Sequence, residues 1–310
     1  MTVVVGTPHE RQDAGAPPIT TVGIVGGGSI GTGVAEVVAR AGFATVVREL
    51  TESLAANAKR AVERSLARAV ERGRATAAER DAALARLDYT AQITDLVECD
   101  LVIEAVSEDL ATKRTLWTEL DAFCAPHTVF ASTTSSLAIA VMAAATARPD
   151  RMVGLHFFQP VPVMPLVEVV RTVTTSETTF RTALEFARRL GKEPIVAKDR
   201  PGFVVNRLLI PYLLDAIHAL ESGVASVADI DRGMHLGAGH PMGPFTLLDF
   251  LGLDTACTIA QVMYEELGDR RFAPPPLLKR MVQAGLFGRK SGKGFYDYTV
   301  EPPRVSELGL

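Results

Sequence analysis

The chain has 310 residues, of which 47% are apolar and 22% are charged, and this composition indicates a soluble globular protein with one large domain or two smaller ones. The net charge of −4 disfavours a general nucleic-acid-binding surface, and no apolar run is long enough to span a membrane. The three cysteines have neither metal-ligand nor paired spacing, which is typical of a cytoplasmic protein without a structural metal.

Residues 1–18 lack the apolar centre of a signal peptide, so we expect a flexible leader. From residue 19 to residue 200, short β-branched runs alternate with helix-compatible stretches, which predicts an α/β domain with a parallel sheet covered by helices. The predicted strands cover residues 20–25, 44–48, 100–105, 128–132, 152–158, 166–170 and 194–197. The predicted helices cover residues 30–41, 51–73, 76–87, 110–123 and 176–190.

The pattern changes after Pro201-Gly202, and residues 201–310 are predicted to form an all-helical second domain. Its helices are expected at residues 203–222, 226–236, 245–267 and 276–285. The first of these is apolar around most of its circumference, and a small helical domain cannot bury such a helix alone. We therefore expect a homodimer through this domain; the alternative is that the helix packs against the first domain.

A glycine-rich segment follows the first predicted strand and opens the first predicted helix. It carries the pattern G-x-G-x-x-G at Gly26, Gly28 and Gly31, with Ser29 and Ile30 between the last two glycines. In this context the first glycine permits a tight turn, the second lets a pyrophosphate approach the backbone, and the third lets helix and strand pack closely. The segment predicts a dinucleotide-binding loop; the alternative is an ordinary glycine-rich turn.

An acidic residue, Glu49, ends the second predicted strand. A carboxylate at this position accepts hydrogen bonds from ribose hydroxyls and repels a 2′-phosphate, which favours NAD over NADP. Arg48 precedes it and leaves two alternatives open, because a guanidinium there can stack on adenine or tolerate a phosphate.

His156 and Glu168 lie symmetrically about Pro162, within a proline-rich turn. If the flanking runs pair as antiparallel strands, both side chains lie on one face of the sheet. A carboxylate beside an imidazole fixes its tautomer and raises its basicity, which suits proton removal from a hydroxyl group. The alternative is a core histidine with a chance neighbour.

Seven stretches of the chain resemble the short-chain L-3-hydroxyacyl-CoA dehydrogenase and 3-hydroxybutyryl-CoA dehydrogenase family, from about residue 19 to the end. The resemblance implies a Rossmann-like, doubly wound domain followed by a helical dimerisation domain. It also implies NAD-dependent interconversion of (S)-3-hydroxyacyl and 3-oxoacyl thioesters. The matching stretches are residues 26–31, 101–108, 132–137, 154–170, 201–209, 237–254 and 290–298.

By position, the resemblance makes His156 the catalytic base and Glu168 its orienting partner. Ser135 and Asn206 match residues that hold the substrate, although each has an alternative role as a helix cap. The resemblance also places two residues near the nicotinamide and its ribose, and these are Glu108 and Lys113. Without the resemblance, Lys113 would read as a solvated helix charge.

Two positions depart from the family pattern, because Thr133 and Gln159 stand where the family usually has asparagine. Threonine lacks the donor and acceptor pair of an amide, whereas glutamine keeps both on a longer arm. We expect activity, with an altered pocket near the nicotinamide or the thioester.

Arginines recur at every fourth position along residues 51–73, and this arginine stripe consists of Arg60, Arg64, Arg68 and Arg72. In the family this helix meets the CoA nucleotide, and Ser65 and Arg72 occupy the matching positions. Guanidinium groups suit phosphate binding, but a solvated helix face and a contact with acyl carrier protein both remain as alternatives.

The leading interpretation is a dehydrogenase acting on short 3-hydroxyacyl-CoA, with 3-hydroxybutyryl-CoA as substrate. The alternative enzyme acts on a 3-hydroxyacyl group carried by acyl carrier protein. A β-hydroxyacid dehydrogenase would need a catalytic lysine on the long helix, where this chain has Asn206 and Arg207. A non-catalytic NAD-binding relative would be expected to lack the His156–Glu168 pair.

Overall fold

The computed structural model describes residues 18–307, so the predicted leader lies outside the described residues except for Pro18. The chain divides into two compact units. The first contains residues 18–134 and 139–199, and the second contains residues 135–138 and 200–307.

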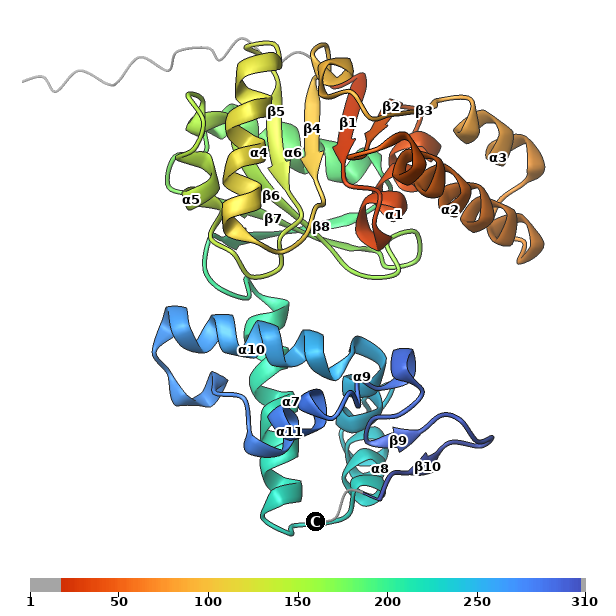
Figure 1. The fold of residues 1–310 in the computed structure, drawn as a ribbon, viewed down its shortest axis with the longest axis vertical. Helices are drawn as coiled ribbons and strands as arrows, with labels where there is room; N and C mark the ends of the chain where they lie inside the picture. Colours follow the sequence, from red (N-terminus) through yellow and green to blue (C-terminus); the bar gives the residue numbers. More distant parts are fainter. Residues whose placement is uncertain (1–17, 308–310) are drawn as a thin grey trace, which may run out of the picture. The chain divides into compact units, whose positions relative to one another are not determined.

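One eight-stranded sheet, in the order β3-β2-β1-β4-β5-β6-β7-β8, forms the centre of the first unit (Figure 1). Neighbouring strands run parallel except for the antiparallel pair β6 and β7. The 3-2-1-4-5-6 part is the doubly wound order, which confirms the predicted Rossmann-like fold class. The strands are β1 (Thr21–Val25), β2 (Ala44–Arg48), β3 (Leu87–Thr90), β4 (Leu101–Glu104), β5 (Val129–Ser132), β6 (Met152–Phe157), β7 (Leu166–Arg171) and β8 (Glu193–Lys198).

Side-chain caps fix where several helices of this unit begin. The hydroxyls of Thr51 and Ser176 and the carboxylate of Asp109 each accept a backbone N–H of the following turn, and Thr76 forms a capping box with Glu79. The helices are α1 (Ser29–Arg40), α2 (Glu52–Glu71), α3 (Ala77–Leu84), α4 (Leu110–Phe123), α5 (Ile139–Ala143) and α6 (Glu177–Arg189). Short 3-10 turns cover Ile93–Leu96 and Pro149–Arg151.

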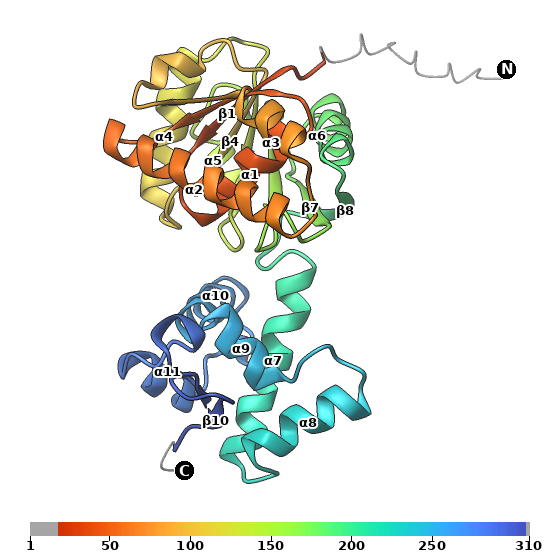
Figure 2. The ribbon, with the colours of Figure 1, turned by 90° about the vertical axis from the view of Figure 1, so that its right-hand side faces the viewer.

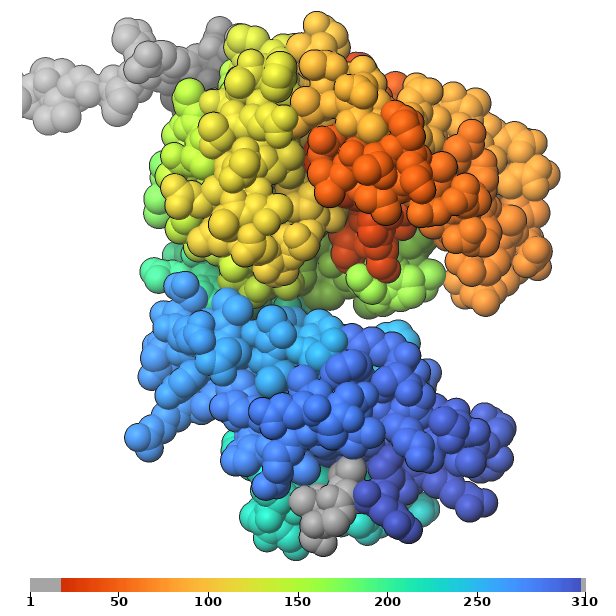
Figure 3. Space-filling model, viewed as in Figure 1, coloured from red at the N-terminus to blue at the C-terminus, as the bar shows by residue number. Residues whose placement is uncertain are grey.

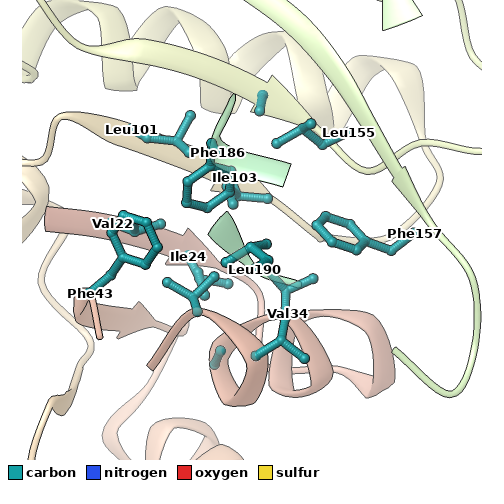
Figure 4. Close-up of a cluster of buried hydrophobic side chains, with 14 of the residues drawn as sticks. Val22, Ile24, Val34, Phe43, Leu101, Ile103, Leu155, Phe157, Phe186 and Leu190 are labelled. Atoms are coloured by element: carbon teal, nitrogen blue, oxygen red, sulfur yellow. The ribbon is translucent and has the colours of Figure 1, made fainter. Parts of the chain in front are cut away.

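The core lies between the sheet and helices α1 and α6 (Figure 4). Apolar side chains of β1, β4 and β6, such as Ile24 and Leu155, are fully buried there. Phe186 of α6 reaches across to Phe43, with ring centroids 5.2 Å apart. Each such side chain contributes roughly 1.5–3 kcal/mol through burial, so this cluster fixes the sheet on which the site is built.

The predicted helix at 76–87 is too long. Helix α3 ends at Leu84, and the following residues form the unpredicted edge strand β3. Only Leu87 of that strand is buried, so its four residues offer no alternating pattern for sequence analysis to detect.

The second unit contains five helices among its described residues, which confirms the predicted helical domain, and it adds one short hairpin that was not predicted. Residues Tyr296–Asp297 (β9) and Arg304–Val305 (β10) pair as a short antiparallel hairpin. The predicted helix at 245–267 is interrupted at Gly252, whose φ of 98° is a conformation that ends one helix before the next begins. The helices are α7 (Val205–Glu221), α8 (Val227–Gly237), α9 (Pro244–Leu251), α10 (Leu253–Leu267) and α11 (Pro276–Gln283). Further 3-10 turns cover Arg270–Phe272 and Arg289–Ser291.

Over residues 18–307, no single helix combines the length and apolarity needed to cross a membrane. Helices α9 and α10 reach that length and apolarity only as a pair, and they are bent by 94° relative to each other.

Candidate active site

The glycine loop joins β1 to α1 with the geometry that its sequence predicts. Gly26 has a φ of 102°, and a Cβ there would lie 2.5 Å from the Ala105 carbonyl oxygen. A Cβ at Gly31 would collide with the Gly26 carbonyl, whereas one at Gly28 would meet nothing within 4 Å. The first and third positions therefore require glycine for the turn and for close packing, and the second opens into free space where a ligand can approach.

This open space is a cofactor-sized groove, a cavity of about 740 Å³ lined by Gly26, Gly28, Arg48, Glu49 and Val106, among others. Ser29 and Ile30 form the first turn of α1 beside it, so the positive end of the helix lies at the glycine loop. The residues present fit a dinucleotide pyrophosphate held on the loop.

The Glu49 carboxylate lies at the end of β2, where it braces the glycine loop. Its Oε1 accepts the Gly27 N–H at 2.6 Å, and its Oε2 accepts the Leu50 N–H at 3.0 Å. Each carboxylate oxygen has a second lone pair available for a ribose hydroxyl. Arg48 Nε is buried without an acceptor among the described residues, so a bound ligand would supply the partner that this donor lacks.

A buried ionic network, which sequence analysis missed, lies beside this groove. Glu104 at the end of β4 and Lys113 on α4 are both fully buried, and Lys113 Nζ lies 2.6 Å from Glu104 Oε1. Glu104 also accepts the Val106 N–H at 2.8 Å and the Ser132 hydroxyl at 2.7 Å. Lys113 is therefore not a solvated helix charge. The sequence feature that could have indicated this network is Glu104, an acidic residue at the end of an otherwise apolar strand.

Glu108 extends this network toward the segment after β5. Its Oε2 lies 3.2 Å from Lys113 Nζ, and its carboxylate also accepts the Thr134 hydroxyl. The predicted residues Glu108 and Lys113 are thus in direct contact, and Lys113 is buried whereas Glu108 is exposed.

The predicted pairing about the proline-rich turn is confirmed, because β6 and β7 are antiparallel and His156 stands directly opposite Glu168. Both side chains are buried, and His156 Nδ1 lies 2.5 Å from Glu168 Oε2. The ring also packs against Phe158, with centroids 4.7 Å apart. Because Nδ1 is paired with the carboxylate, Nε2 is the ring nitrogen that could exchange a proton with a bound ligand.

A buried lysine fixes the turn between these two strands. Lys192 Nζ donates to the carbonyl oxygens of Val161 at 2.6 Å and Met164 at 2.8 Å. Burial lowers the pKa of Lys192 from its ordinary value, as does its repulsion by Arg40. Lys192, which lies outside β6 and β7, therefore stabilises the strand register that places His156 opposite Glu168.

The predicted substrate residues Ser135 and Asn206 belong to the second unit, and their approach to His156 remains a prediction. Asn206 does not have the cap role considered above, because helix α7 begins after Val204 without a side-chain cap. The N–H groups of Ile139 and Ala140, at the start of α5, are accepted by Asp199 at 3.0 and 2.7 Å. Of the two unusual residues, Thr133 is half-buried directly after β5, and Gln159 is exposed directly after Phe158.

The arginine stripe lies on α2, on the outer surface of the first unit (orange in Figure 3). All four arginines are exposed, and Ser65 is half-buried beside them. Arg72 is the C-cap residue of the helix. The face is thus open to a ligand.

The comparisons with known proteins cover both units. The model of the 3-hydroxyacyl-CoA dehydrogenase NAD-binding domain matches residues 21–200, and that of the C-terminal domain matches residues 202–298. The chain belongs to the 3-hydroxyacyl-CoA dehydrogenase family. This membership confirms the resemblance of the sequence motifs.

Among the relatives in this dehydrogenase family, 3-hydroxybutyryl-CoA dehydrogenase of Mycobacterium tuberculosis is 50% identical over 282 residues, which cover 90% of this chain and 99% of the relative. The human mitochondrial hydroxyacyl-coenzyme A dehydrogenase is 46% identical over 284 residues, which cover 89% of this chain and 90% of the relative. The crystal structure of (S)-3-hydroxybutyryl-CoA dehydrogenase from Ralstonia eutropha matches with a TM-score of 0.87 and 41% identity, covering 90% of this chain and 99% of that one.

Proposed function

We propose that this chain interconverts (S)-3-hydroxybutyryl-CoA and acetoacetyl-CoA with NAD as the hydride carrier. The observation that carries the proposal is the buried pair of His156 and Glu168, whose Nδ1 and Oε2 atoms lie 2.5 Å apart. The same unit carries the glycine loop and its groove. A proton-transfer pair and a dinucleotide groove are the two components that oxidation of a secondary alcohol requires.

In the proposed mechanism, NAD supplies the hydride acceptor when it is bound. His156 Nε2 takes the proton of the 3-hydroxyl group during oxidation and returns it to the ketone oxygen during reduction. Glu168 accepts a hydrogen bond from the Nδ1–H group, which fixes the tautomer and stabilises the imidazolium that forms. Ser135 and Asn206 are proposed to hold the reacting oxygen and the thioester carbonyl.

The preference for NAD is tested at Glu49, whose carboxylate is proposed to bind the ribose diol. Replacing Glu49 with Ser or Arg is expected to relax or reverse the preference, because the repulsion of a 2′-phosphate is lost. Rates with NADH and NADPH at equal subsaturating concentrations provide the measurement, and Glu52→Ser at the exposed start of α2 is the control. Faster wild-type turnover with NADPH would contradict the preference for NAD and would indicate that Arg48 binds the 2′-phosphate.

The arginine stripe is proposed to bind the phosphates of CoA, with Ser65 beside them. Charge reversal at Arg64 and Arg68 should raise the KM for the thioester and leave NADH binding unchanged, and added salt should weaken substrate binding. Arg181→Glu on α6, also exposed, is the matched control. An unchanged KM in the double variant would show that the arginine stripe is a solvated surface that does not bind CoA.

The exposed stripe also supports the second candidate, a dehydrogenase of 3-hydroxyacyl groups on acyl carrier protein, because such carriers present acidic surfaces. The two candidates differ in the size of the contact. A carrier protein would need several of the four arginines at once, whereas the CoA nucleotide needs few. Comparing kcat/KM for acetoacetyl-CoA and for the acetoacetyl carrier protein separates them, and Thr133 and Gln159 are the residues to exchange if the carrier protein is preferred.

A homodimer through the second unit is also proposed. Large apolar side chains of this unit are exposed, including Leu208 at 72% and Phe250 at 48%. Sedimentation at micromolar concentration should give twice the chain mass of 33.2 kDa. Leu208→Asp should weaken the dimer, and Val173→Asp in the first unit, a residue that is 96% exposed, should not. A folded wild-type monomer would contradict this assembly.

We infer that the enzyme works in a reducing, cytoplasmic setting. The three cysteines are free thiols. Burial raises the pKa of Cys99 to about 12 and that of Cys124 to about 11, so both remain protonated and unreactive at neutral pH.

A further inference from the structure

A second cavity of the first unit shares no lining residue with the cofactor groove. It measures about 600 Å³ and is bounded by the C-terminal end of α1, by α3, by the end of α6 and by the proline-rich turn. Helices α1, α3 and α6 can be followed together in Figure 2. The proposed reaction uses none of the charged groups in this cavity.

Positive charge dominates the lining of this cavity. Four cationic side chains line it, and only one carboxylate does. The cations come from separate parts of the chain, and they are Arg40, Arg86, Arg189 and Lys192. Lys192 is buried, whereas the three arginines are exposed. The arrangement is therefore a basic pocket with a buried ammonium group and exposed guanidinium groups.

The neighbouring carboxylates offset only part of this charge. Glu79 is committed to the start of its own helix, where it accepts the Thr76 N–H at 2.7 Å. Glu36 is buried beside the pocket and forms an ion pair with Arg40, in which Oε1 lies 3.6 Å from Arg40 Nη1. Glu36 Oε2 has no hydrogen-bond partner among the described residues.

Arg86 and Arg189 are instead anchored by neutral groups, which hold the two guanidinium groups in place without offsetting their charge. Arg86 donates to the Ala82 carbonyl at 2.7 Å, and Arg189 donates to the Ile19 carbonyl at 3.1 Å. The Arg189 guanidinium also stacks on Phe43, 4.2 Å from the ring centroid. Each guanidinium has five N–H donors, so each keeps several for a ligand.

We propose that this basic pocket binds the phosphoryl group of a small metabolite, at a site separate from the cofactor and the substrate. Guanidinium groups bind phosphate oxygens in pairs, and a multiply charged anion would supply the counter-charge for Arg86 and Arg189, whose hydrogen-bond and ring partners are neutral. The inference does not depend on the proposed reaction.

Inorganic pyrophosphate is the probe, because it presents phosphoryl oxygens without a base or sugar. Titration calorimetry on the full chain should be done with saturating NADH and CoA, so that the glycine loop and the arginine stripe are occupied. We expect saturable one-site binding. Arg86→Gln and Arg189→Gln should each weaken it about tenfold or more, because each removes charge-assisted hydrogen bonds.

Arg181→Gln is the matched control, since Arg181 is exposed on α6 but does not line the pocket. It should bind pyrophosphate like the wild type. Absence of binding, or unchanged affinity in both Arg86→Gln and Arg189→Gln, would overturn the proposal. Citrate tests the ligand class, because equally tight binding of this tricarboxylate would overturn the assignment to phosphoryl groups. Arg86→Gln changes an exposed residue, so a folding failure is not expected to obscure the result.

Discussion

Replacing His156 with alanine is expected to lower kcat by roughly 10²–10⁴-fold, the usual contribution of a positioned proton-transfer group. The side chain is buried and held by Glu168, so water cannot replace it with the same orientation. NADH affinity should be retained, because His156 does not line the cofactor groove. Steady-state kinetics together with NADH binding separates the two effects.

Glu168→Gln is the companion variant for this prediction. A neutral amide no longer stabilises the imidazolium, so activity should fall. Near-wild-type kcat in a folded His156→Ala protein would show that proton transfer occurs elsewhere.

The second large effect is expected at Glu104, where replacement by glutamine should reduce the free energy of unfolding of the first unit by about 3 kcal/mol. Removing one partner of a buried ion pair leaves the other charge buried with too little compensation. Lys113 keeps Glu108 at 3.2 Å, which holds the loss near the lower end of the usual range.

Urea unfolding measures this loss, and the only tryptophan of the chain is a suitable reporter. Trp117 lies four residues after Lys113 on α4, fully buried against Phe130 with ring centroids 5.1 Å apart. The double variant Glu104→Leu with Lys113→Met should recover part of the stability, because no unpaired charge remains. If Glu104→Gln unfolded at the wild-type urea concentration, the network would not stabilise the unit.

Much of the first unit was predictable because its signals are local. The glycine loop requires a strand before it and a helix after it, and both were visible as periodic patterns. The pairing of His156 with Glu168 was predictable because a short turn fixes the register of an antiparallel pair. These features depend on residues that are close in sequence.

The features that sequence analysis missed depend on distant residues or on weak patterns. Glu104 was missed as the partner of Lys113, because nothing in the helix of Lys113 shows that Glu104 lies beside it, although Nζ and Oε1 are 2.6 Å apart. Lys192 donates to carbonyl groups 28 and 31 residues away. Every residue has a backbone carbonyl, so the amino-acid sequence does not show which carbonyls are its partners. The break at Gly252 was obscured by the apolar residues on both sides of it.

The most direct test of the account follows NADH oxidation by the purified protein with acetoacetyl-CoA, beside the acetoacetyl carrier protein and beside the His156→Ala variant. The account predicts rapid oxidation of NADH with acetoacetyl-CoA, slower oxidation with NADPH, and a loss of about 10²-fold or more in the variant. No oxidation of NADH with either thioester by a folded wild-type protein would contradict it, and so would equal rates for the wild type and the variant.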